Sequence, residues 1–151
     1  MPQALANVLV HIVFSTKERS PLFKNPNLRD EMHRYLAGVS AQLECPAIIV
    51  GGAIDHVHLL ASQARTIALS EWLKELKRAS SLWAKKKSPE WDSFQWQAGY
   101  GAFSVSESQK ERVQTYILSQ EEHHRQISFQ DELRQFLEKH KVAFNEQYVW
   151  D

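Results

Sequence analysis

Residues 47–61 read AIIVGGAIDHVHLLA and contain the pattern that decides the fold. Two short runs, residues 47–50 and 58–61, are apolar except for His58 and are joined through Gly51-Gly52 to Asp55, a turn-prone stretch. Apolar runs on either side of such a turn predict two strands that pair as a hairpin. We therefore expect a β-hairpin here, and the flanking segments show what it joins.

Upstream of the hairpin, the sequence predicts one strand and one helix. Residues 7–15 alternate with a period of two, which predicts a half-buried strand whose apolar face is Val8, Val10, Ile12 and Phe14. Asn25 and Pro26 supply a helix cap and a first-turn proline. We expect this helix to run to about Glu44 and to end before Pro46. Its apolar residues recur at helical spacing: Leu28, Met32, Tyr35, Leu36, Val39 and Leu43.

Downstream of the hairpin, Ser70 can cap a second helix that is amphipathic and basic. Its apolar side comprises Trp72, Leu73, Leu76, Ala79 and Trp83. A further strand is expected at residues 94–104, where Gly99 and Gly101 indicate a bulge or a close approach of backbones. The sequence does not indicate which strand it pairs with.

Two more helices complete the expected order βαββαβαα. Ser106 can cap a long helix that runs to about Arg125, and Ser128 with Asp131 forms a capping-box pattern that opens the last helix. A strand, a crossover helix, a hairpin and further helices are typical of an α+β fold. We expect a ferredoxin-like sandwich with a mainly antiparallel sheet and helices on one side.

The composition limits the setting and the chemistry. A chain of 151 residues has the size of one domain, so residues 1–151 are expected to form a single domain. Cys45 is the only cysteine, which excludes an intramolecular disulfide and a thiolate metal site. No apolar run approaches the ~20 residues of a membrane span, so a cytoplasmic location without a membrane partner is expected. Lys plus Arg and Asp plus Glu number 18 each, so nucleic-acid binding would depend on local patches.

His56 and His58 form the first candidate site. Residues two apart on a strand point the same way, so both imidazoles lie on one face and Val57 on the other. Two histidines suit several divalent metals but leave the coordination shell incomplete. A purely structural pair is the more common outcome for an isolated His-x-His motif. Asp55 is a candidate to join the metal or to orient a histidine, but on an ideal strand it points away from His56, and shaping the turn is the alternative.

Tyr116 and Gln120 are the candidate nucleophile and the candidate third metal ligand beside the two histidines. They are four residues apart in an expected helix, so they lie about 40° apart around its axis. A tyrosine that attacks a phosphodiester forms a covalent phosphotyrosine and keeps the bond available for rejoining. Because the phenol has a pKa near ~10, attack needs help from a base or a cation. A bound metal would give part of that help, and the side-chain oxygen of Gln120 could complete its shell.

Four motifs follow one another along the chain: HIVFSTKER at residues 11–19, DHVHLL at 55–60, WQAGYGAFSV at 96–105 and YILSQ at 116–120. In this order they resemble the small single-tyrosine transposases of the IS200/IS605 type, including relatives associated with repeated extragenic palindromes. The resemblance spans nearly the whole chain.

This resemblance implies a function for the candidate residues. In that family the His-hydrophobe-His element holds a catalytic divalent metal, Mg²⁺ or Mn²⁺, and the tyrosine forms a 5′-phosphotyrosine with single-stranded DNA. A Gln or Asn four residues later completes the metal site, and these roles fall on His56, His58, Tyr116 and Gln120. The resemblance also implies an imperfect DNA hairpin as partner and a homodimer, in many members with active sites shared between subunits.

Two alternatives remain open beside this function. The first is a domesticated hairpin-binding protein with little or no strand transfer, and the second is an α+β protein with a structural or regulatory metal.

His123 and His124 are rival ligands, although histidines at a helix end are more often solvated. The rival tyrosines are Tyr35, Tyr100 and Tyr148. Candidate phosphate contacts, for which a solvated surface is the alternative, are Lys17, Arg19, Lys74, Lys77, Arg78 and Lys85.

Overall fold

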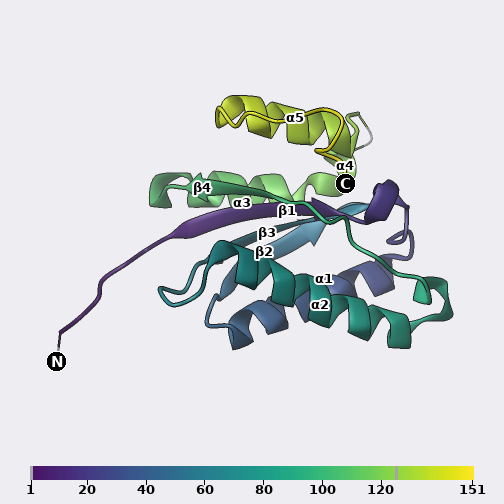
Figure 1. The fold of residues 1–151 in the computed structure, drawn as a ribbon, viewed down its shortest axis with the longest axis horizontal. Helices are drawn as coiled ribbons and strands as arrows, with labels where there is room; N and C mark the ends of the chain where they lie inside the picture. Colours follow the sequence, from purple (N-terminus) through teal and green to yellow (C-terminus); the bar gives the residue numbers. More distant parts are fainter. Residues whose placement is uncertain (1, 125) are drawn as a thin grey trace.

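A four-stranded sheet lies at the centre of the computed structural model, which describes residues 2–124 and 126–151 (Figure 1). Three short 3-10 turns, Lys17–Arg19, Pro89–Trp91 and Glu107–Gln109, connect the main elements. The main elements are β1 (Leu9–Ser15), α1 (Pro26–Gln42), β2 (Ala47–Gly52), β3 (His56–Ser62), α2 (Leu69–Lys87), β4 (Gly101–Val105), α3 (Lys110–Leu118), α4 (Gln120–His123) and α5 (Phe129–Lys139). None of the described helices is both long enough and apolar enough to cross a membrane.

The strands pair antiparallel in the order β2-β3-β1-β4. The expected hairpin is present as β2 and β3, although Gly51-Gly52 ends β2 instead of forming the turn. The fourth strand is shorter than expected, because β4 begins at Gly101. The stretch before it bonds to a side chain: the Lys77 Nζ atom donates to the backbone oxygens of Gln97, Ala98 and Gly99.

Helices cover both faces of the sheet, and this corrects one part of the expected architecture. The α+β class and the antiparallel sheet are confirmed, but α1 and α2 lie on one face while α3, α4 and α5 lie on the other (Figure 1). The reason is visible in β1, which is buried along its whole length instead of being half-buried. One face contributes Ile12 and Phe14 to the core under α1 and α2, and the other contributes Val13 to the core under α5.

Two of the four helix caps expected from the sequence are present, and the Ser106 side chain makes no cap hydrogen bond. Asn25 accepts hydrogen bonds from the amides of Asn27 and Leu28, and Ser128 accepts one from the amide of Asp131, so these two expected caps are confirmed. The expected cap at Ser70 is wrong, because α2 begins at Leu69 with Ala68 in the cap position, so Ser70 lies inside the first turn.

The expected third helix is interrupted. Ser106 opens a 3-10 turn, α3 ends at Leu118, and a break at Ser119 separates it from the short α4. Arg125, where this helix was expected to end, lies outside the described residues. Tyr116 and Gln120 are therefore in different helical segments.

Gly51 allows α3 to pack closely against β2. A Cβ atom at this position would lie 2.7 Å from Ile117 Cγ2 and 2.8 Å from the Ile117 backbone oxygen. We expect Gly51→Ala to push α3 outward and to lower the free energy of unfolding by about 1–3 kcal/mol, as overpacking does. Urea denaturation measures this change. The control is Gly38→Ala, where the added methyl meets nothing within 4 Å; equal stability of the two variants would contradict the prediction.

Candidate active site

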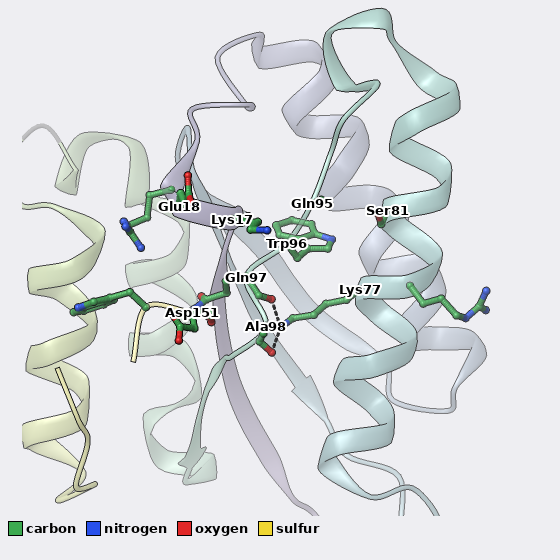
Figure 2. Close-up of a pocket in the computed structure, with 12 residues that line it drawn as sticks. Lys17, Glu18, Lys77, Ser81, Gln95, Trp96, Gln97, Ala98 and Asp151 are labelled. Carbon is green, nitrogen blue, oxygen red and sulfur yellow. Dashed lines mark hydrogen bonds between the residues drawn. The ribbon is translucent and has the colours of Figure 1, made fainter. Parts of the chain in front are cut away.

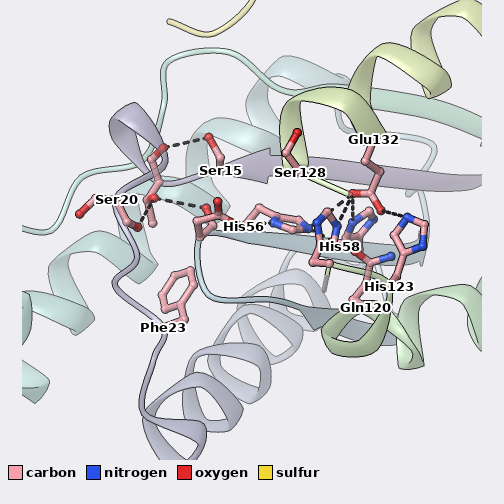
Figure 3. Close-up of polar contacts among 12 residues, drawn as sticks. Ser15, Ser20, Phe23, His56, His58, Gln120, His123, Ser128 and Glu132 are labelled. Carbon is pink, nitrogen blue, oxygen red and sulfur yellow. Dashed lines mark hydrogen bonds and ion pairs between the residues drawn. The ribbon is translucent and has the colours of Figure 1, made fainter. Parts of the chain in front are cut away.

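A buried polar cluster lies between β3 and the helices α3, α4 and α5. Figure 3 shows His56, His58, Gln120 and Glu132 pointing toward one another from three different elements. Each of these four side chains is at most 1% exposed. Because buried polar groups must find partners, the contacts within the cluster define what it can do.

The two histidines of β3 are oriented as the strand alternation predicts. Val57 packs in the core under α1 and α2, so His56 and His58 face the other side of the sheet. The Nδ1 atom of His56 lies 2.7 Å from Asp55 Oδ1, and the Nδ1 atom of His58 lies 2.8 Å from His11 Nε2. Both rings are thus held at Nδ1, and both Nε2 atoms are directed into the cluster.

Two neighbours hold these histidines in place. Asp55 contacts His56, which was one of the alternatives left open for it, because it precedes β3 and does not have the geometry of an ideal strand. His11 was not among the residues chosen from sequence. His11 lies on the same face of β1 as Leu9 and Val13, so a histidine on that face of a buried strand was the signal that could have found it.

Gln120 and Tyr116 reach the cluster from the two helical segments on either side of Ser119. Gln120 Oε1 lies 3.2 Å from His56 Nε2, and the ring centroid of Tyr116 lies 5.8 Å from that of His58. The break at Ser119 therefore leaves both side chains in the same pocket. The four residues chosen from sequence are brought together within one chain.

Glu132 is the acidic member of the cluster, and sequence reasoning missed it. Its Oε1 atom lies 3.0 Å from His58 Nε2, 3.1 Å from His124 Nε2 and 3.5 Å from His56 Nε2. Its other oxygen, Oε2, accepts a hydrogen bond from the Tyr116 hydroxyl. The available signal was a carboxylate between Phe129 and Leu133 on the apolar face of the last helix.

The donor set fits a divalent metal. One ligand atom from each of His56, His58, His124 and Glu132 lies within 4.8 Å of the others, and Gln120 Oε1 adjoins them. Imidazole nitrogen together with carboxylate and amide oxygen is a combination that suits divalent metals such as Mn²⁺. The cluster therefore has the chemistry of a metal site, with a tyrosine hydroxyl at its side.

Burial and the charge within the cluster both favour the protonated form of the tyrosine. Burial alone would raise the pKa of Glu132, but hydrogen bonds from His124, His56 and His58 hold this pKa well below its usual range. Burial likewise opposes the charge on His56, yet Asp55 and Glu132 outweigh it and raise its pKa to about 9. Burial and the negative charge of Glu132 raise the pKa of Tyr116. A cation beside the phenol would reverse this effect.

The rival tyrosines lie outside the cluster. Tyr35 stacks on Trp83 with ring centroids 4.7 Å apart, while Tyr100 and Tyr148 are exposed on the surface. Of the rival histidines, His124 adjoins Glu132 Oε1, and His123 Nε2 lies 3.4 Å from the Tyr116 hydroxyl oxygen.

Four of the six candidate phosphate contacts line a cavity of about 640 Å³ that also includes Trp96 and Trp150 (Figure 2). Lys17 and Arg19 enter it from the turn after β1, and Lys77 and Arg78 enter it from α2. Lys77 is committed to three backbone oxygens, and burial lowers its pKa to about 8. The other two candidates, Lys74 and Lys85, are exposed on α2 and do not line this cavity.

The chain belongs to the family described as "Transposase IS200 like", whose model matches residues 4–120. Among curated proteins it is similar to the ISDra2 transposase TnpA of Deinococcus radiodurans, with 29% identity over 73% of this chain and 81% of that protein. The resemblance to this transposase family is thereby confirmed.

Two solved structures share the fold. The crystal structure assigned to a transposase from Deinococcus radiodurans has a TM-score of 0.62 and 23% identity, and the match covers 80% of this chain and 96% of that one. The structure of a REP-associated tyrosine transposase bound to a REP hairpin has a TM-score of 0.54 and 14% identity, and the match covers 79% and 70% of the two chains.

Proposed function

We propose that this transposase cleaves and rejoins single-stranded DNA beside a hairpin, with Tyr116 as nucleophile. The observation that carries the proposal is the meeting of Tyr116 and Gln120 with His56 and His58 in one buried pocket. A nucleophile that adjoins a metal-ligand set is the arrangement that phosphoryl transfer requires. Membership in a transposase family supplies the class of reaction.

In the proposed reaction the Tyr116 oxygen bonds to phosphorus while the bond from phosphorus to the 3′ oxygen breaks. The product is a 5′-phosphotyrosine, and a free 3′ hydroxyl can later reverse the step and rejoin the strand. The hydroxyl proton has its nearest acceptor in Glu132, to which the Tyr116 hydroxyl donates, and a second candidate acceptor in His123, whose Nε2 atom lies 3.4 Å from the Tyr116 oxygen. Histidine is the residue that most often performs this role.

The metal in this proposal is Mg²⁺ or Mn²⁺, held by His56, His58 and Gln120. When bound, it would supply positive charge that stabilises the charge developing on the phosphate. Asp55 and His11 hold the two imidazole rings at Nδ1, so both Nε2 atoms are already oriented as ligands.

The proposed partner is a single-stranded DNA segment with an imperfect hairpin. The structural relative bound to a REP hairpin supports this choice, and the cavity lined by Lys17 and Arg19 offers phosphate contacts. Because the four candidate residues meet within one chain, we propose that the active site forms in cis. A homodimer of this chain would then carry two complete sites.

The second candidate function is hairpin binding with little or no strand transfer. The observation that favours it is the closure of the cluster: His56 and His58 are fully buried, and the Tyr116 hydroxyl already donates to Glu132. A protein that binds DNA through its surface cavity does not need to open this cluster.

One experiment separates the two functions. Hairpin-bearing oligonucleotides taken from DNA that flanks the gene are labelled at the 3′ end or at the 5′ end and incubated with the protein in Mg²⁺ or Mn²⁺. We expect only the 3′ label to remain with the protein on a denaturing gel, because a 5′-phosphotyrosine retains the downstream fragment, and we expect EDTA to abolish this band. A gel shift without any covalent band would favour the second function, and a retained 5′ label would contradict the proposed polarity.

A further inference from the structure

Helix α5 lies outside the part of the chain that matches the family model, yet it contributes to the candidate active site. The family match ends at residue 120, whereas α5 spans Phe129–Lys139. Its contribution is Glu132, which is 1% exposed and points into the cluster (Figure 3). The sequence motifs assigned to the site do not include this residue.

We propose that Glu132 is a further metal ligand, so that the C-terminal helix completes the coordination shell begun by His56 and His58. This inference rests on the proposed function and adds an anionic ligand to it. Its geometric basis is the position of Glu132 Oε1, which lies 3.0 Å from His58 Nε2 and 3.5 Å from His56 Nε2. A carboxylate oxygen this near two imidazole nitrogens can share one ion with them.

The chemistry of the metal favours this fourth ligand. His56, His58 and Gln120 together form a neutral set, and Mg²⁺ and Mn²⁺ prefer oxygen ligands, carboxylates above all. Glu132 supplies such an oxygen together with a negative charge. Among residues 2–124 and 126–151, the ion pairs of Glu132 involve histidines only. A buried carboxylate is stabilised when it coordinates a metal, so a divalent ion at this position would compensate its charge.

The two oxygens of Glu132 face different partners. Oε1 faces the histidine nitrogens, while Oε2 accepts the hydrogen bond from the Tyr116 hydroxyl. The same carboxylate therefore connects the metal position to the nucleophile. A metal held by Oε1 would draw negative charge from Oε2 and so reduce its effect against ionisation of the phenol.

Packing fixes the carboxylate in this position. Phe129, Leu133 and Leu137 of α5 form an apolar cluster with Val13 and Phe103 of the sheet, and Glu132 is adjacent to Leu133 on the same buried side. The cap at Ser128 sets the start of the helix. A ligand on a helix that is anchored in this way is oriented before the metal arrives.

Calorimetric titration of the full-length, DNA-free protein with Mn²⁺ tests the inference. We expect Glu132→Gln, which keeps the shape and removes the charge, to weaken Mn²⁺ binding at least about tenfold. The matched control is Glu138→Gln, because Glu138 is an exposed carboxylate on the same helix; its Mn²⁺ affinity should equal that of the wild type.

A second measurement needs no variant and covers the case in which Glu132→Gln does not fold. The infrared difference spectrum of the wild-type protein with and without Mn²⁺ should contain carboxylate bands if Glu132 is a ligand. A spectrum with imidazole bands alone would overturn the inference, as would wild-type Mn²⁺ affinity in a folded Glu132→Gln protein.

The outcomes also distinguish this inference from the proposed function. If His56→Ala loses Mn²⁺ and the wild type forms the DNA adduct, but Glu132→Gln binds Mn²⁺ normally, only the role of Glu132 is wrong. If Glu132→Gln loses Mn²⁺ while the wild type forms no adduct with cognate DNA, the carboxylate ligand stands and strand transfer by Tyr116 fails.

Discussion

We expect Tyr116→Phe to abolish the covalent protein–DNA adduct while hairpin binding stays unchanged. The substitution removes only the hydroxyl oxygen, which is the atom that would bond to phosphorus. Because no adduct can form without a nucleophile, the loss should exceed about a thousandfold, in line with the removal of catalytic nucleophiles in other enzymes. Denaturing gels measure the adduct, and native gels with the same oligonucleotide measure binding.

The control for this prediction is Tyr148→Phe, since Tyr148 is exposed and lies outside the cluster. It should form the adduct at the wild-type rate. An adduct that persists in Tyr116→Phe, or one that disappears in Tyr148→Phe, would show that another residue attacks the DNA. The fold should survive the Tyr116 change, because a hydrogen bond to a charged group is worth about 1.5–3 kcal/mol and Glu132 keeps its histidine partners.

The elements that could be foreseen from sequence depend on local signals. The helix at Asn25-Pro26 and the helix at Ser128 both begin where a side chain caps the backbone within three residues. The hairpin of β2 and β3 likewise requires only neighbouring segments. Such patterns involve only residues that are close together in the sequence, so they can be recognised without knowledge of the rest of the fold.

The arrangement of helices about the sheet depends on longer-range packing and was foreseen only in part. β1 lies between β3 and β4, and Leu9, His11 and Val13 are buried on the face opposite Ile12 and Phe14. The period-two pattern of residues 7–15 predicted burial only for the face that contains Ile12 and Phe14. Leu9 and Val13 on the second face were the indication that helices would cover both sides.

In the candidate site, too, local patterns predict some of the residues and long-range packing determines the others. His56 and His58 lie two residues apart and Tyr116 and Gln120 four apart, so strand and helix periodicity places each pair on one face. Glu132 and His11 join His58 from separations of 74 and 47 residues. No local pattern specifies such contacts, and only the sheet register and the docking of α5 bring these residues to the histidines.

The second large effect is expected at the histidines themselves: His56→Ala and His58→Ala should each abolish detectable Mn²⁺ binding and adduct formation. In both rings Nδ1 is engaged by a neighbour, Asp55 or His11, so Nε2 is the nitrogen that faces the metal position. Alanine removes this ligand, and a coordination shell with one imidazole fewer holds the metal less tightly. Calorimetry with Mn²⁺ and the adduct assay measure the two losses on the same protein preparations.

Asp55→Asn provides the graded comparison, because Asp55 contacts His56 without adjoining the other ligand atoms. Loss of its charge should weaken Mn²⁺ binding about 10–100-fold, as changes to groups that orient a ligand usually do. His140→Gln is the control, since His140 packs against Phe103 away from the ligand set and should leave Mn²⁺ affinity unchanged.

If both His56→Ala and His58→Ala bound Mn²⁺ as the wild type does, these histidines would be structural, and the metal of this transposase would have to bind elsewhere. A graded series of strong loss, intermediate loss and no loss would instead assign the metal to the Nε2 atoms of His56 and His58.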